Sequence, residues 1–159
     1  MFETVSGLPL HPLVVHAVVV IGPLSALGAV AYALVPRWRS WLRWLVFLGA
    51  AATAGGAFVA RESGEFLESR VTGGQPPSAD LERHIELAGR LVYVTWGWLA
   101  LVAILCLVVP AALRRRESTP VSANVVSGVL LVAGAAALVY LTVVTGDAGS
   151  SAVWGGVVQ

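Results

Sequence analysis

Four long apolar stretches, separated by short charged segments, dominate the pattern of hydrophobic and polar residues along the chain. The uncharged stretches cover residues 4–36, 44–60, 91–113 and 118–146. An α-helix needs about 20 mainly apolar residues to cross the hydrocarbon core of a bilayer, and in lipid its backbone groups must bond to one another. The pattern therefore predicts four transmembrane helices, at about 12–35, 41–60, 88–113 and 121–145.

The sequence lacks the alternating strands of about ten residues that build a membrane barrel. We therefore expect an all-α integral membrane protein with one domain over residues 1–159, in which the four transmembrane helices form an antiparallel bundle. A polar connection at about 61–84 should separate the second helix from the third.

The composition supports a membrane protein and excludes several other classes. Hydrophobic residues make up 57% of the chain, charged residues 12%, and the mean hydropathy is +0.82. Soluble domains carry about twice this charged fraction. The formal net charge of +1 gives no basic surface for nucleic acid. The single cysteine, Cys106, lies in an apolar run and is expected to be a small core residue.

The positions of the arginines predict the orientation of the helices. Cytoplasmic loops of membrane proteins are enriched in Lys and Arg. The first connection carries Arg37, Arg39 and Arg43, and the third carries three consecutive arginines at 114–116. Both should be cytoplasmic, which places both termini and the 61–84 connection outside. Because Glu3 and no arginine precede the first apolar stretch, we expect a retained helix rather than a cleaved signal peptide.

Small residues recur at four-residue spacing in the first two helices. This spacing places them on one helix face, where they let backbones approach closely. The sets are Gly22/Ala26, Ser25/Ala29/Ala33, Ala51/Gly55 and Ala52/Gly56/Ala60. They predict tight packing, either inside the bundle or against a second copy or a partner.

The segments outside the apolar stretches carry their own signals. The glutamates at 62, 65 and 68 with apolar residues between them predict that the second helix continues to about Val71. The Gly-Gly-Gln-Pro-Pro run at 73–77 should end it, and Ser78 should cap a helix that runs into the third span. Gly146 and Gly149 are expected to end the fourth helix, so that the remaining tail folds over the outer rim or lies in the interface.

Most ionisable residues of the outer side gather in one rim. Ionisable groups near membrane depth are functional candidates because their burial is costly. The rim contains His11, His16, His84, Glu62, Glu65, Arg61, Arg90 and Asp147. One interpretation is structural, with a Glu86–Arg90 pair on one helix face and an Arg61–Asp147 pair between helices.

Two further interpretations give the rim a cofactor. His16 and His84, on the first and third helices, are the natural pair of axial ligands for haem b. Alternatively, a divalent metal is held by His11, His16, His84, Glu62 and Glu65, with His11 placed before the first helical turn so that it can converge with His16. No catalytic residue is predicted, since the sequence has no Gly-x-Ser-x-Gly elbow or comparable motif.

Three short motifs resemble a known family. Leu-Pro-Leu-His-Pro-Leu at 8–13 opens the first helix, His84 precedes the third, and Thr145, Gly146, Gly149 and Val153 form a Thr-Gly-x-x-Gly-x-x-x-Val segment near the end. In order, length and topology the chain resembles bacterial membrane proteins of the domain of unknown function 2231 family. The resemblance implies a four-helix protein of the bacterial inner membrane and brings no established activity.

These observations lead to one functional hypothesis and two alternatives. The first is a non-enzymatic membrane component or accessory subunit that contacts the lipid bilayer and forms a homo-oligomer or binds a membrane partner. The second is a haem- or metal-binding electron-transfer protein that uses the histidines of the first and third helices. The third is a small-molecule or ion transporter, suggested by a kink at Pro23 and the charge of Arg90.

Overall fold

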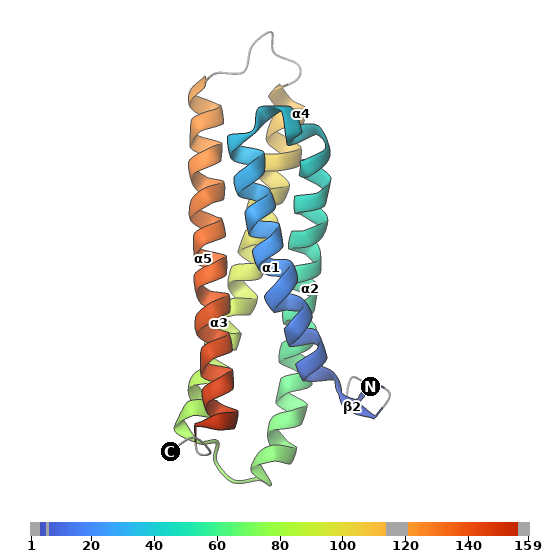
Figure 1. The fold of residues 1–159 in the computed structure, drawn as a ribbon, viewed down its shortest axis with the longest axis vertical. Helices are drawn as coiled ribbons and strands as arrows, with labels where there is room; N and C mark the ends of the chain where they lie inside the picture. The colour runs from blue at the N-terminus through green and yellow to red at the C-terminus, as the bar shows by residue number, and fades with distance from the viewer. Residues whose placement is uncertain (1–3, 6, 114–120, 156–159) are drawn as a thin grey trace.

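The computed structural model describes residues 4, 5, 7–113 and 121–155, and it contains four helices long and apolar enough to cross a membrane. They lie side by side along the long axis of the molecule (Figure 1). They are α1 (Leu10–Leu34), α2 (Arg39–Thr72), α3 (Ala79–Val102) with its continuation, and α5 (Val121–Trp154). The prediction of four helices long and apolar enough to span a membrane is therefore confirmed, while the arginines at 114–116, which were predicted to be cytoplasmic, lie outside the described residues.

Short elements complete the described chain. Two-residue strands β1 (Thr4–Val5) and β2 (Leu8–Pro9) pair antiparallel across Gly7, whose φ of 81° supplies the turn. A 3₁₀ turn at Pro36–Trp38 joins α1 to α2. A π-helical segment, Ala103–Val108, continues α3 into the short α4 (Val109–Leu113). The strands precede α1, and among the other short elements the π-helical segment and Val109 of α4 contribute to the core.

The ends of α2 and α3 follow the sequence signals. The second helix continues to Thr72, one residue beyond the predicted limit, and Gly73 ends it with a left-handed φ of 59°. Ser78 caps α3, because its hydroxyl accepts a hydrogen bond from the backbone N–H of Leu81 at 3.3 Å. The polar connection is therefore mostly helical.

Two predicted boundaries were wrong. α1 begins at Leu10, so His11 lies inside its first turn and not before it. α5 continues through Gly146 and Gly149 to Trp154, so the predicted tail after Gly146 is helical as far as the structure describes it. A glycine inside a helix also leaves room for a side chain that packs closely against the backbone. Gly149 has this role.

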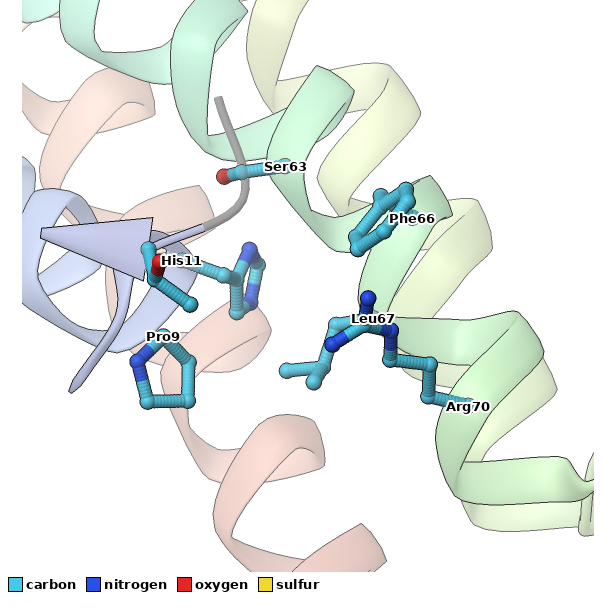
Figure 2. Close-up of a pocket in the computed structure, with 7 residues that line it drawn as sticks. Pro9, His11, Ser63, Phe66, Leu67 and Arg70 are labelled. Carbon is cyan, nitrogen blue, oxygen red and sulfur yellow. The ribbon is translucent and has the colours of Figure 1, made fainter. Parts of the chain in front are cut away.

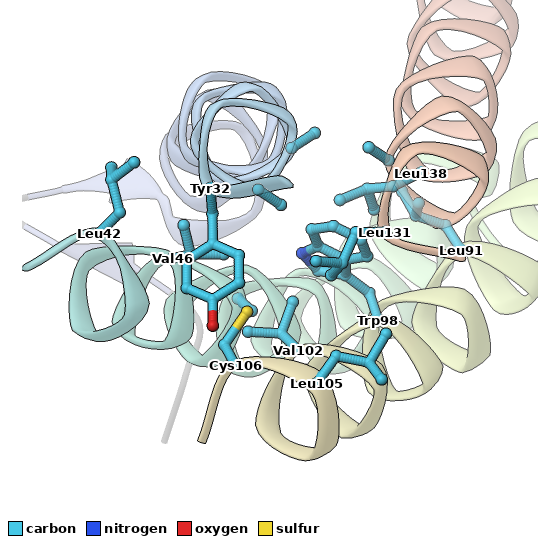
Figure 3. Packing of buried hydrophobic residues seen from close by; sticks show 14 residues of the cluster. Tyr32, Leu42, Val46, Leu91, Trp98, Val102, Leu105, Cys106, Leu131 and Leu138 are labelled. Atoms are coloured by element: carbon cyan, nitrogen blue, oxygen red, sulfur yellow. The ribbon is translucent and has the colours of Figure 1, made fainter. Parts of the chain in front are cut away.

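The core lies between the four helices and combines a few large side chains with many small ones. Trp98, Leu131 and Leu138 fill its centre, with Cys106 beside Tyr32 (Figure 3). Of the predicted small-residue sets, those on α1 pack inside the bundle, together with Ala60 of α2. By contrast, Ala52 and Gly55 of α2 point outward. Close backbone approach is therefore used mainly within one chain.

The buried positions reveal an internal repeat. Adding 73 to the buried residues Val18, Gly22, Ser25, Ala29 and Tyr32 of α1 gives Leu91, Thr95, Trp98, Val102 and Leu105, which are all buried. Adding 85 to Val46, Ala50, Thr53, Ala57, Ala60 and Ser63 of α2 gives Leu131, Ala135, Leu138, Thr142, Thr145 and Ala148, again all buried. The chain therefore consists of two similar helical hairpins, α1–α2 and α3–α5.

Equivalent residues of the two hairpins meet along one line through the bundle. Trp98 Nε1 donates a hydrogen bond to Ser25 Oγ at 3.1 Å, and these positions are 73 residues apart. Arg39 Nη1 donates to Asn124 Oδ1 at 3.0 Å, and these positions are 85 apart. A residue can touch its own equivalent only at a two-fold axis, so these contacts mark a pseudo-two-fold axis between the hairpins.

The π-helical segment marks a place where the two hairpins differ by one residue. Val35-Pro36 follows α1, and the matching Val109-Pro110 lies 74 residues later rather than 73. A π-helical turn holds one residue more than an α-helical turn. It also relieves the clash that Pro110 would make with the carbonyl of Cys106, four residues earlier, in a regular α-helix. The extra residue is thus absorbed without disturbing the packing before Ala103.

Equivalent glycines make room for the axis contacts. A Cβ at Gly49 would lie 3.1 Å from Ser25 Cβ, and a Cβ at Gly134, 85 residues later, would lie 3.1 Å from Trp98 Cζ3 and 2.8 Å from Leu101 Cδ2. The Trp98 ring is held by its hydrogen bond and cannot move aside freely. A side chain at either position would therefore crowd the neighbouring helix near the axis.

We predict that Gly134→Val destabilises the protein by roughly 1–3 kcal/mol, because the added side chain overpacks the Trp98 site. Gly97→Val is the matched control, since Gly97 is an exposed helical glycine with nothing within 4 Å of its Cβ position. Thermal unfolding of both purified variants in the same detergent measures the difference. Equal melting temperatures would contradict the packing of Trp98 against Gly134.

Candidate functional site

His11 and His84 meet at one end of the bundle, on the pseudo-two-fold axis. His11 lies in the first turn of α1, and His84 lies 73 residues later in the second turn of α3. Their ring centroids are 6.4 Å apart, and the ring planes are nearly perpendicular at 87°. Both side chains are partly buried. The two hairpins therefore contribute one equivalent imidazole each to this end of the molecule.

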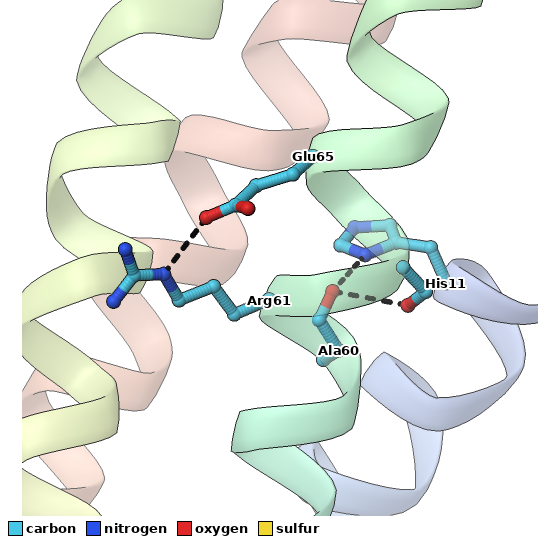
Figure 4. A network of polar contacts seen from close by, with 5 residues as sticks. His11, Ala60, Arg61 and Glu65 are labelled. Carbon is cyan, nitrogen blue, oxygen red and sulfur yellow. Dashed lines mark hydrogen bonds and ion pairs between the residues drawn. The ribbon is translucent and has the colours of Figure 1, made fainter. Parts of the chain in front are cut away.

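His11 is held by the backbone of α2. Its Nδ1 donates to the carbonyl oxygen of Ala60 at 2.7 Å, and the same oxygen accepts from Ser63 Oγ at 3.1 Å (Figure 4). The ring packs on Gly64, where a Cβ would lie 3.0 Å from both Cε1 and Nδ1. A carbonyl and a glycine four residues apart thus hold the His11 ring.

His84 is held by α5 in the same way. Its Nδ1 donates to the carbonyl oxygen of Thr145 at 3.0 Å. The ring packs on Gly149, where a Cβ would lie 2.9 Å from Cε1. Thr145 and Gly149 are the residues that the repeat makes equivalent to Ala60 and Gly64. The site is thus built twice, once by each hairpin.

These contacts determine the tautomer of both neutral imidazoles. A carbonyl oxygen only accepts, so the hydrogen must be on Nδ1, and Nε2 keeps its lone pair. A hydrogen bond from Nδ1 to a backbone carbonyl is also the usual support of a histidine that ligates a metal through the other nitrogen. The site therefore presents two fixed imidazoles whose Nε2 atoms can accept a hydrogen bond or ligate a metal.

His16 does not belong to this pair. It is exposed, and its Nδ1 donates to the carbonyl oxygen of Pro12 in its own helix at 2.6 Å. At about 100° per residue, a spacing of five residues turns His16 about 140° away from His11. The structure thus gives His84 a different partner from the predicted His16.

The predicted metal set of three histidines and two glutamates is not assembled. Glu65 forms an exposed ion pair with Arg61 at 3.1 Å, and Glu62 is exposed on the same helix. In residues 4–5, 7–113 and 121–155, no three His, Cys, Asp or Glu side chains lie close enough together to hold a metal ion. Glu65 is turned toward Arg61 (Figure 4), and both glutamates are exposed whereas the two imidazoles are partly buried, so the predicted set does not come together.

The remaining rim residues form local contacts. Arg90 pairs with Glu86 on an exposed face of α3, as predicted. The predicted Arg61–Asp147 pair was wrong, because Arg61 pairs with Glu65 one turn further along α2. Arg90 therefore forms a local ion pair on the surface of α3.

A small cavity lies beside His11, between β2 and α2 (Figure 2). Its volume of about 30 Å³ suits a water molecule or a single ion. Its lining is mixed, with the Arg70 guanidinium over the Phe66 ring at 4.6 Å. The lining residues are Thr4, Pro9, His11, Ser63, Phe66, Leu67 and Arg70.

The hydroxyl of Thr145 is a further polar group beside the histidine pair. Other buried hydroxyls of these helices, those of Thr53, Ser63, Thr95 and Thr142, donate to carbonyls three or four residues earlier. Thr145 Oγ1 is buried and has no hydrogen-bond partner among the described residues. An unsatisfied buried hydroxyl costs about 1–3 kcal/mol. The residue that holds His84 thus has spare hydrogen-bonding capacity.

Arg39 organises the opposite end of the axis, which the sequence analysis treated only as a cytoplasmic charge. Its Nε and Nη2 donate to the carbonyl oxygens of Tyr32 and Ala33, at 3.0 and 3.1 Å, near the end of α1. Its Nη1 bonds to Asn124. Gly64 was missed, and the contacts of Arg39 and Gly149 were not foreseen. Comparing the sequence with itself at shifts of 73 and 85 residues would have pointed to the histidine and glycine pairs.

One comparison with known proteins gives a match. A family model described as "Predicted membrane protein (DUF2231)" matches residues 7–159. No curated protein and no solved structure matches.

We predict that ¹⁵N NMR of histidine-labelled protein shows, for the neutral form of both His11 and His84, a protonated Nδ1 and a bare Nε2. Gly149→Ala should shift the His84 signals by crowding its ring, whereas Gly97→Ala should leave them unchanged. The His16→Ala variant identifies the third set of signals. Protonation at Nε2 with a bare Nδ1 would contradict the bonds to Ala60 and Thr145.

Proposed function

This chain belongs to the DUF2231 family of predicted membrane proteins, and from that premise we propose a non-enzymatic component or accessory subunit of the bacterial inner membrane. In this proposal the four helices form an antiparallel bundle with both termini and the histidine pair outside the cytoplasm. The arginines between α1 and α2 support this orientation, because cytoplasmic loops are rich in positive charge.

The observation that carries the proposal is the set of small residues left on the outside of the bundle. Ala52 and Gly55 are exposed on α2, and Ala133, Ala136 and Ala137 are exposed on α5. Apolar side chains gain little by leaving lipid, so helices associate in membranes where small residues allow close packing and dispersion contacts. Ala52 and Ala137 are equivalent positions of the repeat, and both faces are suited to a second copy or a partner helix.

We expect Ala52→Cys to give an oxidative dimer cross-link in membrane vesicles, because close approach brings two such thiols together. Leu27→Cys is the control, since Leu27 is 65% exposed on α1, away from these small residues. Gly55→Leu added to Ala52→Cys should reduce the cross-link at least several-fold, and it leaves the fold intact because nothing lies within 4 Å of the Gly55 Cβ position. Equal cross-linking at both cysteines would contradict association through α2.

A second candidate function is a haem- or metal-binding electron-transfer protein, and the His11–His84 pair favours it. Both imidazoles are fixed through Nδ1, and their centroids are 6.4 Å apart. Two histidines on opposite sides of one metal centre have centroids about 6 Å apart when each metal–nitrogen bond is about 2.0 Å. The candidate thus uses His11 in place of His16.

If this candidate is correct, protein purified from its native membrane will carry stoichiometric haem or metal, seen by its absorption spectrum and by elemental analysis. His84→Asn should remove the bound group, because the asparagine amide can still donate to Thr145 but has no second ligand nitrogen. His16→Asn should have no effect. Colourless, metal-free wild-type protein would rule this candidate out and leave the first proposal standing.

A further inference from the structure

We propose that His11 and His84 form a two-coordinate site for a cuprous ion, with one Nε2 ligand from each hairpin. The inference deepens the histidine-site candidate above and does not depend on association through α2. It starts from the position of the pair on the pseudo-two-fold axis, where a single ion meets equivalent groups from both sides.

The first argument is that the two imidazoles, which would donate the ligand nitrogens, are already held in place by the protein. Each Nδ1 is bound to a backbone carbonyl, and each ring is confined by a glycine of the facing helix. These contacts fix the tautomer and limit ring rotation, so little side-chain entropy is lost when Nε2 binds an ion. Two partly buried imidazoles arranged in this way by two separate helix pairs form a built site rather than an accidental contact.

The second argument is the separation of the rings. A metal ion in line between two Nε2 atoms, with bonds of about 2.0 Å, places the ring centroids about 6 Å apart. The observed separation is 6.4 Å. The angle of 87° between the ring planes is compatible with such an ion, because linear coordination does not restrict rotation of each ring about its metal–nitrogen bond.

The third argument is the number and type of ligands. Zinc sites use about four ligands, and calcium and magnesium need six or more oxygens. The described residues contain no cluster of three potential ligands. Cuprous ion is the common biological metal ion that is stable with two ligands in a line, and imidazole is a good ligand for copper. The ligand set therefore selects a low coordination number.

The fourth argument is charge. Within the described ranges 4–5, 7–113 and 121–155, no Asp or Glu forms a three-ligand group with the two imidazoles, and Glu65 is paired with Arg61. An ion bound here is compensated only by neutral ligands, and the cost of burying an uncompensated charge is large. Burying a monovalent ion costs far less free energy than burying a divalent ion. This preference again favours the cuprous ion over zinc or cupric ion.

The size of the neighbouring cavity separates an ion from a haem. The cavity beside His11 has a volume of about 30 Å³. Pockets for organic ligands have volumes of about 300–1,000 Å³. This cavity, which His84 does not line, is therefore too small for a haem. The same pair of imidazoles would ligate either centre, so the experiment must distinguish them.

The test uses the full-length protein in detergent under anaerobic conditions. Cuprous ion is titrated in competition with a coloured chelator, and silver(I) serves as a redox-inert probe in calorimetry. We expect one ion per chain and an X-ray absorption spectrum of linear copper with two nitrogen neighbours at about 2 Å. Zinc, added in the same buffer, should bind at least about tenfold more weakly.

Matched variants separate ligation from folding. His11→Asn and His84→Asn keep a donor for Ala60 and Thr145 but lack Nε2, so each should lower the copper affinity at least about 100-fold, since losing even a supporting contact costs 10–100-fold. Their melting temperatures should stay close to that of the wild type. His16→Asn should bind copper normally.

The possible outcomes are distinct. No copper binding together with haem in the native protein would overturn the copper proposal while keeping the histidine-site candidate. No bound group of either kind would overturn both. Copper binding that survives loss of His11 or His84, or that needs His16, would overturn the two-coordinate site.

Discussion

The hydrogen bond from Trp98 to Ser25 is the contact on which the rest of the bundle depends. An indole N–H and a hydroxyl at membrane depth have no water to bond to, so they must find partners inside the protein. Trp98 donates to Ser25, and Ser25 in turn donates to the carbonyl oxygen of Val46 at 3.3 Å. This short chain of hydrogen bonds joins α3, α1 and α2, and Gly49 and Gly134 leave room for the close contacts beside it.

The same axis organises the ends of the molecule. Arg39 and Asn124 meet at one end, and His11 and His84 meet at the other. At each level one hairpin supplies a polar group and the other supplies its equivalent. The histidine end differs from the other two levels, because its rings bond to backbone carbonyls and not to each other. Their Nε2 atoms can therefore accept a hydrogen bond or ligate a metal, and this makes the histidine end the functional candidate.

Local signals in the sequence were enough to predict the helices but not the arrangement of the residues in the site. Charge placement gave the four spans, and Ser78 and Gly73 gave the ends of the 61–84 connection. Gly149 was misread as a helix end because its role depends on the His84 ring, 65 residues earlier. The partner of His84 could not be predicted for the same reason. Packing along the whole helix decides which face of α1 meets α3. Helical periodicity therefore places both His11 and His16 on α1 without showing which of them faces His84.

The pairing of Ser25 with Trp98 also bears on how such a protein can be made. Two identical hairpins, assembled as a dimer, would place the same residue on both sides of the axis. Two tryptophans would overfill the space there, and two serines would leave a void. A small residue opposite a large one requires two halves with different sequences, and fusion into one chain guarantees that each molecule contains one of each. The central hydrogen bond therefore depends on two hairpins of different sequence being joined in one chain.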